Sequence, residues 1–473
     1  MKWIIREIPF PIRLENVFAH LYRDEPYAFW LDGNRLSPGL GRYSFMGANP
    51  SFLVRVQEGK TEWIQKNELQ IDTGNPFQAI QKILDLYRAP GQIDEPFPFI
   101  GGLVGYFGYE MNRFIENVPA CREDPTQAPT AYWMFADQVI IHDQLEGKSY
   151  ISKWINEIEG EKELEKWISA CKQASDAPLA EPDIFSPEWD SSFVQVESYD
   201  SYCRKIKRIL GEIASGNIYQ ACFTHQLSTD FPHHPFDLYR VLRRVNPAPF
   251  SAYLRFEDLF ILSSSPERFL KLDRQRRLES RPIKGTRPRG SSKEEDEALV
   301  FDLKTNEKDR AENVMIVDLV RNDLGKVCEI GSVRVSELLK VESYATVHQL
   351  VTVVEGMLAK NVPPLQAIQA AFPGGSMTGA PKIRAMEILH ELEPVARGIY
   401  SGGLGYLDVR GGFDLSMVIR TMILRGGRAF FHVGGGIVAD SDEKLEYQES
   451  MDKALALKKA ILMAKGRCTS RFV

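Results

Sequence analysis

The chain has 473 residues and a net charge of −6, with 44% hydrophobic and 26% charged residues. This composition is typical of a globular protein with a large core, and it gives no reason to expect a nucleic acid or an anionic membrane as partner. Arg6, Arg13 and Glu15 interrupt the N-terminal segment, unlike in a signal peptide, and no uncharged stretch reaches the roughly 18 residues of a membrane span. We therefore expect a cytoplasmic protein.

The first region, residues 1–175, is predicted to mix strands and helices. Runs of apolar, aromatic and β-branched residues favour strands, and apolar residues at helical spacing favour helices. The predicted strands are residues 52–56, 102–110 and 133–141, and the predicted helices are residues 76–87 and 161–172. Residues 176–193 are rich in Pro, Ser and Asp and have no apolar period, so we expect a linker there.

The second region, residues 194–465, begins with a helix that Ser198 is placed to cap and Gly216 to end. Further strands are predicted at residues 218–227, 252–256, 259–263, 402–407 and 415–424, and further helices at 307–324 and 441–464. The mixture indicates an α+β fold with layered sheets.

The six cysteines are scattered, without the spacing of a zinc site or a redox pair. We expect them to be free thiols in a reducing compartment. None lies in a G-x-C-x-G turn, so no thiol nucleophile of the glutaminase type is visible.

The last predicted helix carries three charged residues on one face, because Glu446, Glu449 and Lys453 are spaced i, i+3 and i+7. Two carboxylates so placed can approach one Mg²⁺ ion, and the lysine can hold a ligand carboxylate. The alternative is a solvated helix face with an intrahelical salt bridge.

Two glycine-rich segments are candidates for anion binding. Gly434, Gly435 and Gly436 follow a strand-like segment and can present backbone N–H groups to a ligand, although a tight turn is the alternative. The second segment, FPGGSMTGAPK, leads through Thr378 into a helix whose first residue we expect to be Pro381. It departs from the Walker phosphate loop, so a carboxylate is the expected ligand.

Two further charged residues are candidates whose role depends on the fold. Glu312 lies one turn before the apolar stripe of the helix predicted at 307–324, and it is a metal ligand only if the fold brings it to Glu446 and Glu449. Lys284 lies near three arginines in sequence, and crowding by cations together with burial would lower its pKa as a nucleophile requires. A basic surface loop is the alternative.

Five motifs in this order, PIKGT, AENVMIVDLVRNDLG, FPGGSMTGAPK, GGGIVADS and EYQES, resemble the chorismate-binding enzymes over residues 194–465. LDGN and GRYSFMG in residues 1–175 are similar to the first region of that family. The resemblance implies a large two-layered α/β structure with antiparallel sheets and flanking helices, and one Mg²⁺-dependent site.

The resemblance also implies a role for each candidate. Glu312 and Glu449 match metal ligands, and Glu446 matches an acidic residue beside them; the metal holds the ring carboxylate of chorismate. Glu267 in SSSPERF matches the general acid/base at the C4 hydroxyl. The remaining matches contact the substrate: Lys453 and the amides of Gly434, Gly435 and Gly436 at the ring carboxylate, Tyr400 and Arg420 at the enolpyruvyl carboxylate, and Thr378 and His348 along the ring.

Two positions distinguish members of this family. Isochorismate and salicylate synthases carry a water-activating lysine where this chain has Gln220, and anthranilate synthases carry alanine where it has Lys284. Aminodeoxychorismate synthases carry the PIKGT lysine, which implies a covalent lysine intermediate and amination at C4. A partner glutaminase subunit, forming a heterodimer, would supply the ammonia for this step of 4-aminobenzoate and folate synthesis. The alternatives are an anthranilate synthase component I and a non-catalytic chorismate-binding regulator.

The family's tryptophan pocket is altered in this chain. Gly33 replaces the serine of an L-[ED]-S motif, and Ser251 replaces the methionine of tryptophan-inhibited anthranilate synthases. This departure argues against feedback inhibition by tryptophan and leaves a structural tryptophan open.

Overall fold

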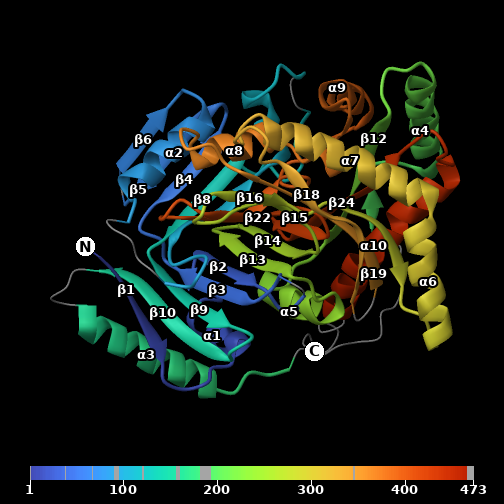
Figure 1. The fold of residues 1–473 in the computed structure, drawn as a ribbon. Helices are drawn as coiled ribbons and strands as arrows, with labels where there is room; N and C mark the ends of the chain where they lie inside the picture. The colour runs from blue at the N-terminus through green and yellow to red at the C-terminus, as the bar shows by residue number, and fades with distance from the viewer. Residues whose placement is uncertain are drawn as a thin grey trace.

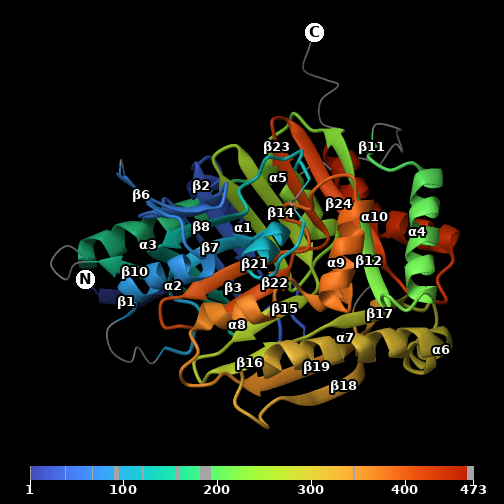
Figure 2. The same cartoon turned by 90° about the horizontal axis from the view of Figure 1, so that it is seen from above.

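The computed structural model describes residues 2–37, 39–66, 68–89, 95–119, 122–155, 160–181, 193–344 and 347–465. Two twelve-stranded antiparallel sheets lie face to face, with helices on their outer faces (Figures 1 and 2). The predicted α+β fold of two antiparallel sheets with flanking helices is confirmed. Across the described ranges, no helix has the length and apolar content needed to cross a membrane.

The first sheet joins strands from both ends of the chain. Its order is β1 (Lys2–Ile8), β10 (Lys148–Ile155), β9 (Gln138–Asp143), β3 (Tyr43–Ala48), β2 (Tyr27–Asp32), β13 (Phe250–Phe256), β14 (Leu259–Ser265), β23 (Thr421–Arg425), β24 (Arg428–Ile437), β12 (Gln220–Asp230) and β11 (Val194–Gln195), with β20 (Gly379–Ala380) also paired to β12. The N-terminal strands meet the C-terminal ones where Asp32 of β2 lies opposite Ser251 of β13.

The second sheet is assembled in the same way. Its order is β17 (Ile283–Pro288), β19 (Val347–Met357), β16 (Arg277–Ser280), β15 (Arg268–Leu272), β22 (Phe413–Met417), β21 (Gly403–Asp408), β7 (Gly102–Phe107), β8 (Ala131–Ala136), β4 (Leu53–Gln57), β5 (Lys60–Gln65) and β6 (Glu68–Asp72), with β18 (Arg334–Ser343) also paired to β19. Here the two regions meet between β7 and β21, where Phe107 lies opposite Gly403. Residues 1–175 and 194–465 thus share both sheets, and residues 182–192 of the predicted linker lie outside the described residues.

The helices bury apolar stripes against these sheets. Against the first sheet pack α1 (Leu14–Leu21), α3 (Gly160–Asp176), α5 (Pro235–Val245) and α10 (Glu443–Lys465), and against the second α2 (Pro76–Leu86), α6 (Lys293–Thr305), α7 (Glu307–Gly325) and α8 (Pro364–Ala371). The helices α4 (Tyr199–Ala214) and α9 (Lys382–Leu392) pack together beside β12, and Ser198 caps α4 as predicted. Between the sheets, Phe45 of β3 contacts Tyr406 of β21 edge to face, with ring centroids 5.6 Å apart.

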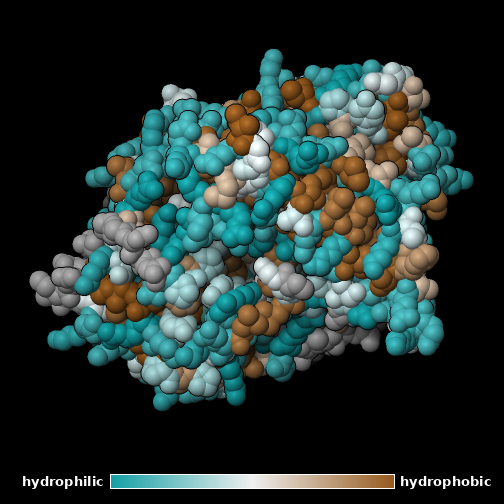
Figure 3. Space-filling model, in the orientation of Figure 1, coloured by the Kyte–Doolittle hydropathy of each residue, from teal (hydrophilic) through white to brown (hydrophobic). Residues whose placement is uncertain are grey.

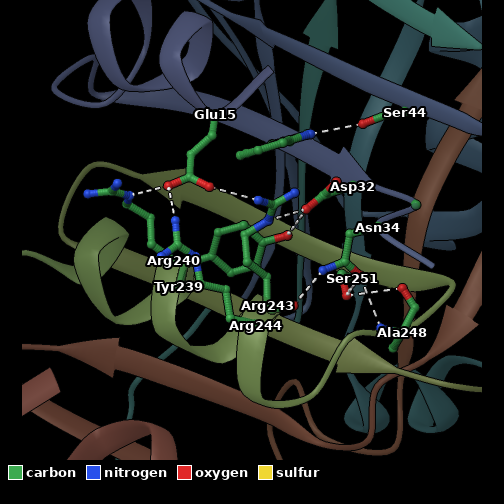
Figure 4. A network of polar contacts seen from close by, with 12 residues as sticks. Glu15, Asp32, Asn34, Ser44, Tyr239, Arg240, Arg243, Arg244, Ala248 and Ser251 are labelled. Carbon is green, nitrogen blue, oxygen red and sulfur yellow. Dashed lines mark hydrogen bonds and ion pairs between the residues drawn. The ribbon is translucent and has the colours of Figure 1, made fainter. Parts of the chain in front are cut away.

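A polar network fastens the two regions together at the α1–α5 contact (Figure 4). Glu15 of α1 accepts hydrogen bonds from Arg240, Arg243 and Arg244 of α5. Asp32 at the end of β2 also accepts from Arg243, at 2.7 Å. Because these carboxylates are largely buried, losing their arginine partners would be costly. The altered tryptophan-pocket positions lie beside this network, and Ser251 donates a hydrogen bond to Asn34.

Two predicted strands are wrong, and the reason is the same for both. Residues 133–141 form parts of β8 and β9, which lie in different sheets, and residues 415–424 are divided between β22 and β23 in the same manner. At each place the chain crosses from the second sheet to the first. At the crossing between β22 and β23, Arg420 has a positive φ of 52°. Apolar residues continue through both crossings, so the sequence pattern could not reveal them.

Candidate active site

The three glycines form part of a strand. Gly434, Gly435 and Gly436 belong to β24 and lie opposite Thr224, Phe223 and Cys222 of β12, so the alternative of a tight turn is wrong. A side chain here would have no room: a Cβ on Gly434 would lie 2.1 Å from the Phe223 carbonyl, and one on Gly436 would lie 2.4 Å from the Gln220 amide nitrogen. Glycine therefore allows β24 to pass this close to β12 and to Gln220. We call residues 434–436 the glycine floor.

The helix α10 places its charged residues over this glycine floor. A Cβ on Gly435 would lie 3.1 Å from Glu446 Oε2 and 4.0 Å from Glu449 Oε1, so both carboxylates face the strand, as the helical spacing predicted. Lys453 Nζ pairs with Glu449 at 2.8 Å and donates to the Gly434 carbonyl at 2.9 Å. Burial opposes ionisation of Glu449, but Lys453 and the other nearby lysines outweigh it and lower its pKa.

The helix α7 brings a third carboxylate to the same place. Glu312 Oε2 lies 3.6 Å from Nζ of Lys284, whose strand β17 packs against α7. Burial raises the pKa of Glu312, although the charges of Lys284 and Lys308 act against it. One turn earlier on α7, Lys308 Nζ pairs with Glu446 of α10 at 3.2 Å. The fold therefore places Glu312 in the same cluster as the α10 carboxylates.

Lys284 lies beside the glycine floor, but the arginines expected to crowd it do not. Its Nζ lies 3.2 Å from the position that a Cβ of Gly436 would occupy. Three arginines close in sequence instead pair with carboxylates elsewhere: Arg281 with Glu342, Arg287 with Asp302 and Asp309, and Arg289 with Asp296. Next to Lys284, the buried amide of Gln220 has no hydrogen-bond partner on either atom among the described residues, which suits a polar ligand at this point.

Glu267 lies where the chain crosses from β14 to β15, between the two sheets. Burial raises the pKa of Glu267 to about 7, while a hydrogen bond from Ser376 and the charge of Lys284 act against the rise. Ser376 donates to Glu267 Oε1 at 3.0 Å from the loop before α9. Sequence reasoning missed Ser376, although it lies inside a motif that was singled out. A carboxyl group that titrates near neutrality can act as a general acid.

Tyr400 and Arg420 lie near each other, and Arg420 is also close enough to Glu449 for their charges to interact. Tyr400 is buried, and its ring stacks on His432 with centroids 5.1 Å apart. Burial lowers the pKa of Arg420, with the nearby Tyr400 and Glu449 acting against it. In the described part of the chain, no side chain or carbonyl forms a hydrogen bond or ion pair with its guanidinium. An unpaired, mostly buried guanidinium is well suited to a carboxylate ligand.

Two other predicted contacts are engaged elsewhere. The Thr378 hydroxyl donates to the carbonyls of Gly374 and Gly375 within its own loop. Both ring nitrogens of His348 are taken, by Ser343 at 2.8 Å and Asp296 at 2.9 Å. The structure does not bring His348 into the carboxylate and lysine cluster, and the role of both residues along a substrate ring stays a prediction.

The cluster offers a metal the right chemistry, but the three predicted ligands are held apart. Carboxylate oxygens are the donors that Mg²⁺ prefers, and the space over Gly435 is one that a side chain would fill. In the ranges that the structure covers, however, no three metal-binding side chains lie close enough to hold one ion. Glu312, Glu446 and Glu449 each face a lysine instead.

The model of the family described as "chorismate binding enzyme" matches residues 25–459. The chain belongs to this family. The match spans both predicted regions, as expected of a chorismate binding enzyme whose two regions share both sheets.

The relatives of this chorismate binding enzyme include aminodeoxychorismate synthases and anthranilate synthases. It is 40% identical to the aminodeoxychorismate synthase of Streptomyces griseus over 97% of its own length but only 64% of that relative's, and 37% identical to aminodeoxychorismate synthase component 1 of Bacillus subtilis (strain 168) over 90% of each chain. The solved anthranilate synthase component I of Streptococcus pneumoniae TIGR4 is 30% identical and superposes with a TM-score of 0.78, over 88% of this chain and 92% of that one.

Proposed function

We propose that the chain catalyses the amination of chorismate at C4, giving 4-amino-4-deoxychorismate in the route to 4-aminobenzoate and folate. The observation that carries the proposal is the position of Lys284, whose amine lies beside Glu312, Gln220 and the glycine floor. The similarity to aminodeoxychorismate synthases supports it. A pure binding protein would have no use for a nucleophilic amine next to a buried acid.

The proposed reaction begins at C2 of the bound ring. Lys284, in its neutral form, attacks C2; the two ring double bonds shift, and the C4–O bond breaks. Glu267 gives its proton to the departing hydroxyl, which leaves as water. Ammonia then adds at C4, the double bonds shift back, and the C2–N bond to lysine breaks. The enolpyruvyl group is retained throughout.

The remaining residues position the substrate. Arg420 and Tyr400 hold the enolpyruvyl carboxylate, while Lys453 and the backbone of β24 contact the ring carboxylate. Mg²⁺ held by Glu312 and Glu449, with Glu446 beside them, would neutralise the ring carboxylate. We further propose that a separate glutaminase subunit supplies the ammonia.

The source of nitrogen and the product together test this function. The purified chain with chorismate, Mg²⁺ and ammonium chloride is expected to form aminodeoxychorismate, identified by mass spectrometry, and to form nothing with glutamine alone. Adding a glutaminase subunit should restore the use of glutamine. Formation of anthranilate would instead assign the chain to the other aminating branch of the family, and no product at all would favour a chorismate-binding regulator.

Ser376→Ala is expected to shift the pH dependence of the first step. A hydrogen bond to the carboxylate stabilises its ionised form, so removing the Ser376 hydroxyl should raise the pKa of Glu267 above about 7. Glu267 must be protonated to act as an acid, and the rate falls as pH rises through this pKa. The fall should therefore move upward by roughly half to one pH unit.

The rate of covalent adduct formation without ammonia measures this shift, since ammonia has its own titration. Ser376→Thr keeps a hydroxyl and should retain the wild-type profile. An unchanged profile in Ser376→Ala would mean that the hydroxyl does not act on Glu267.

A further inference from the structure

Each of the three carboxylates proposed for the metal site faces a different lysine. The Nζ–Oε distances are 3.6 Å for Lys284 and Glu312, 3.2 Å for Lys308 and Glu446, and 2.8 Å for Lys453 and Glu449. Two of these lysines have a proposed task in the reaction, as nucleophile and as substrate contact. Lys308 has none.

Lys308 forms an ion pair between the two helices of the cluster, α7 and α10. It extends from α7, one turn before Glu312, to Glu446 on α10. Glu446 is nearly fully buried, and its Oε1 also accepts a hydrogen bond from Ser441 at 2.6 Å. Its other oxygen, Oε2, faces the space over Gly435. The ammonium therefore neutralises the Glu446 carboxylate from the Oε1 side, while Oε2 stays turned toward the space that a divalent cation would enter.

The balance of charges in the site indicates how Lys308 affects metal binding. Arg420 and the three lysines balance Glu312, Glu446, Glu449 and an ionised Glu267, so the site has little net charge before anything binds. A divalent cation that binds alone adds two positive charges next to Lys308. A dianionic substrate removes that excess. Repulsion from Lys308 therefore acts against the metal alone much more than against the metal and substrate together.

We infer that Lys308 is an internal counter-cation that competes with the divalent metal for Glu446, so that the metal binds weakly until a dicarboxylate substrate joins it. This inference rests on the proposed function, because it takes the metal site from it.

Binding of Mn²⁺, followed from the free-ion signal in electron paramagnetic resonance, tests the inference without turnover. Lys308→Met removes the charge and keeps most of the chain length. It should bind Mn²⁺ in the absence of substrate roughly three- to ten-fold more tightly than wild type. Lys308→Arg keeps the charge and should bind as wild type does. Lys304→Met, on the neighbouring helix α6 and exposed, serves as the matched control and should change nothing.

The direction of the change in Mn²⁺ affinity decides whether the inference holds. Weaker or equal binding in Lys308→Met would overturn the inference, since the lysine would then support the carboxylate or be irrelevant to the metal. Lys308→Gln provides a second neutral variant in case the methionine variant folds poorly. If neither the wild type nor any Lys308 variant binds Mn²⁺, the metal site of the proposed function fails, and the inference fails with it. If wild type binds Mn²⁺ but the neutral variants gain nothing, only the inference fails.

Discussion

Lys284→Ala is expected to lose amination at C4, with a fall in turnover of roughly three orders of magnitude or more. The amine lies 3.6 Å from Glu312 and next to the glycine floor, so its loss should remove the proposed nucleophile and leave the surrounding fold in place. Incubating wild type with chorismate and Mg²⁺, without ammonia, should add one ligand mass to the peptide that contains Lys284. Mass spectrometry of the digested variant should find no such adduct.

Two further variants distinguish the loss of a nucleophilic amine from the loss of a positive charge. Lys284→Arg keeps a positive charge but should not rescue activity, because guanidinium stays protonated and cannot attack carbon. Lys360→Ala, an exposed lysine after β19, should behave as wild type. With C2 now open to ammonia, Lys284→Ala could also release anthranilate. Aminodeoxychorismate at the wild-type rate from Lys284→Ala would show that the nucleophile has been assigned wrongly.

Arg420→Met is expected to lower kcat/KM about 100-fold or more and to make the fold more stable. The guanidinium is mostly buried, and within the described ranges it has no hydrogen-bond or ion-pair partner, so its charge is desolvated in the free protein. Methionine fills similar space without that cost, and the free energy of unfolding should rise by on the order of 1 kcal/mol. Steady-state kinetics and thermal melting measure the two effects.

Arg425→Met is the matched control for this change. Arg425 lies in the following strand, partly exposed, and pairs with Asp258 at 3.0 Å. It also donates hydrogen bonds to the carbonyls of Thr126 and Gln127, at 3.1 and 2.7 Å. Its loss should therefore leave activity unchanged and lower the free energy of unfolding, the opposite direction to Arg420→Met. A fall in stability in Arg420→Met would mean that the guanidinium has a structural role rather than being held ready for a ligand.

Sequence reasoning was most successful where a pattern is local. The cap at Ser198 and the shared face of Glu446 and Glu449 follow from the geometry of a helix, and both are confirmed. The strands predicted at 133–141 and 415–424 are wrong because an apolar run does not show where the chain leaves one sheet for the other. Both sheets face the same core, so the composition hardly changes at the crossing.

The site residues that the sequence could not supply depend on distant partners. Ser376 and Lys308 have their place only because the fold brings them to Glu267 and Glu446. The arginines near Lys284 were expected to crowd it, yet each finds a carboxylate on another element. Charged residues that are close in sequence need not contact each other, because long side chains can reach partners on several other elements.

The sharing of both sheets by the two regions bears on how the chain is made. The contacts between β2 and β13, and between β7 and β21, join residues that leave the ribosome more than 200 positions apart. Until β13 and β21 are synthesised, the N-terminal strands have two unpaired apolar edges, which are prone to pair with other chains. We therefore expect the nascent protein to complete its fold only late in synthesis, after a stage in which both strand edges are open to pairing with other chains.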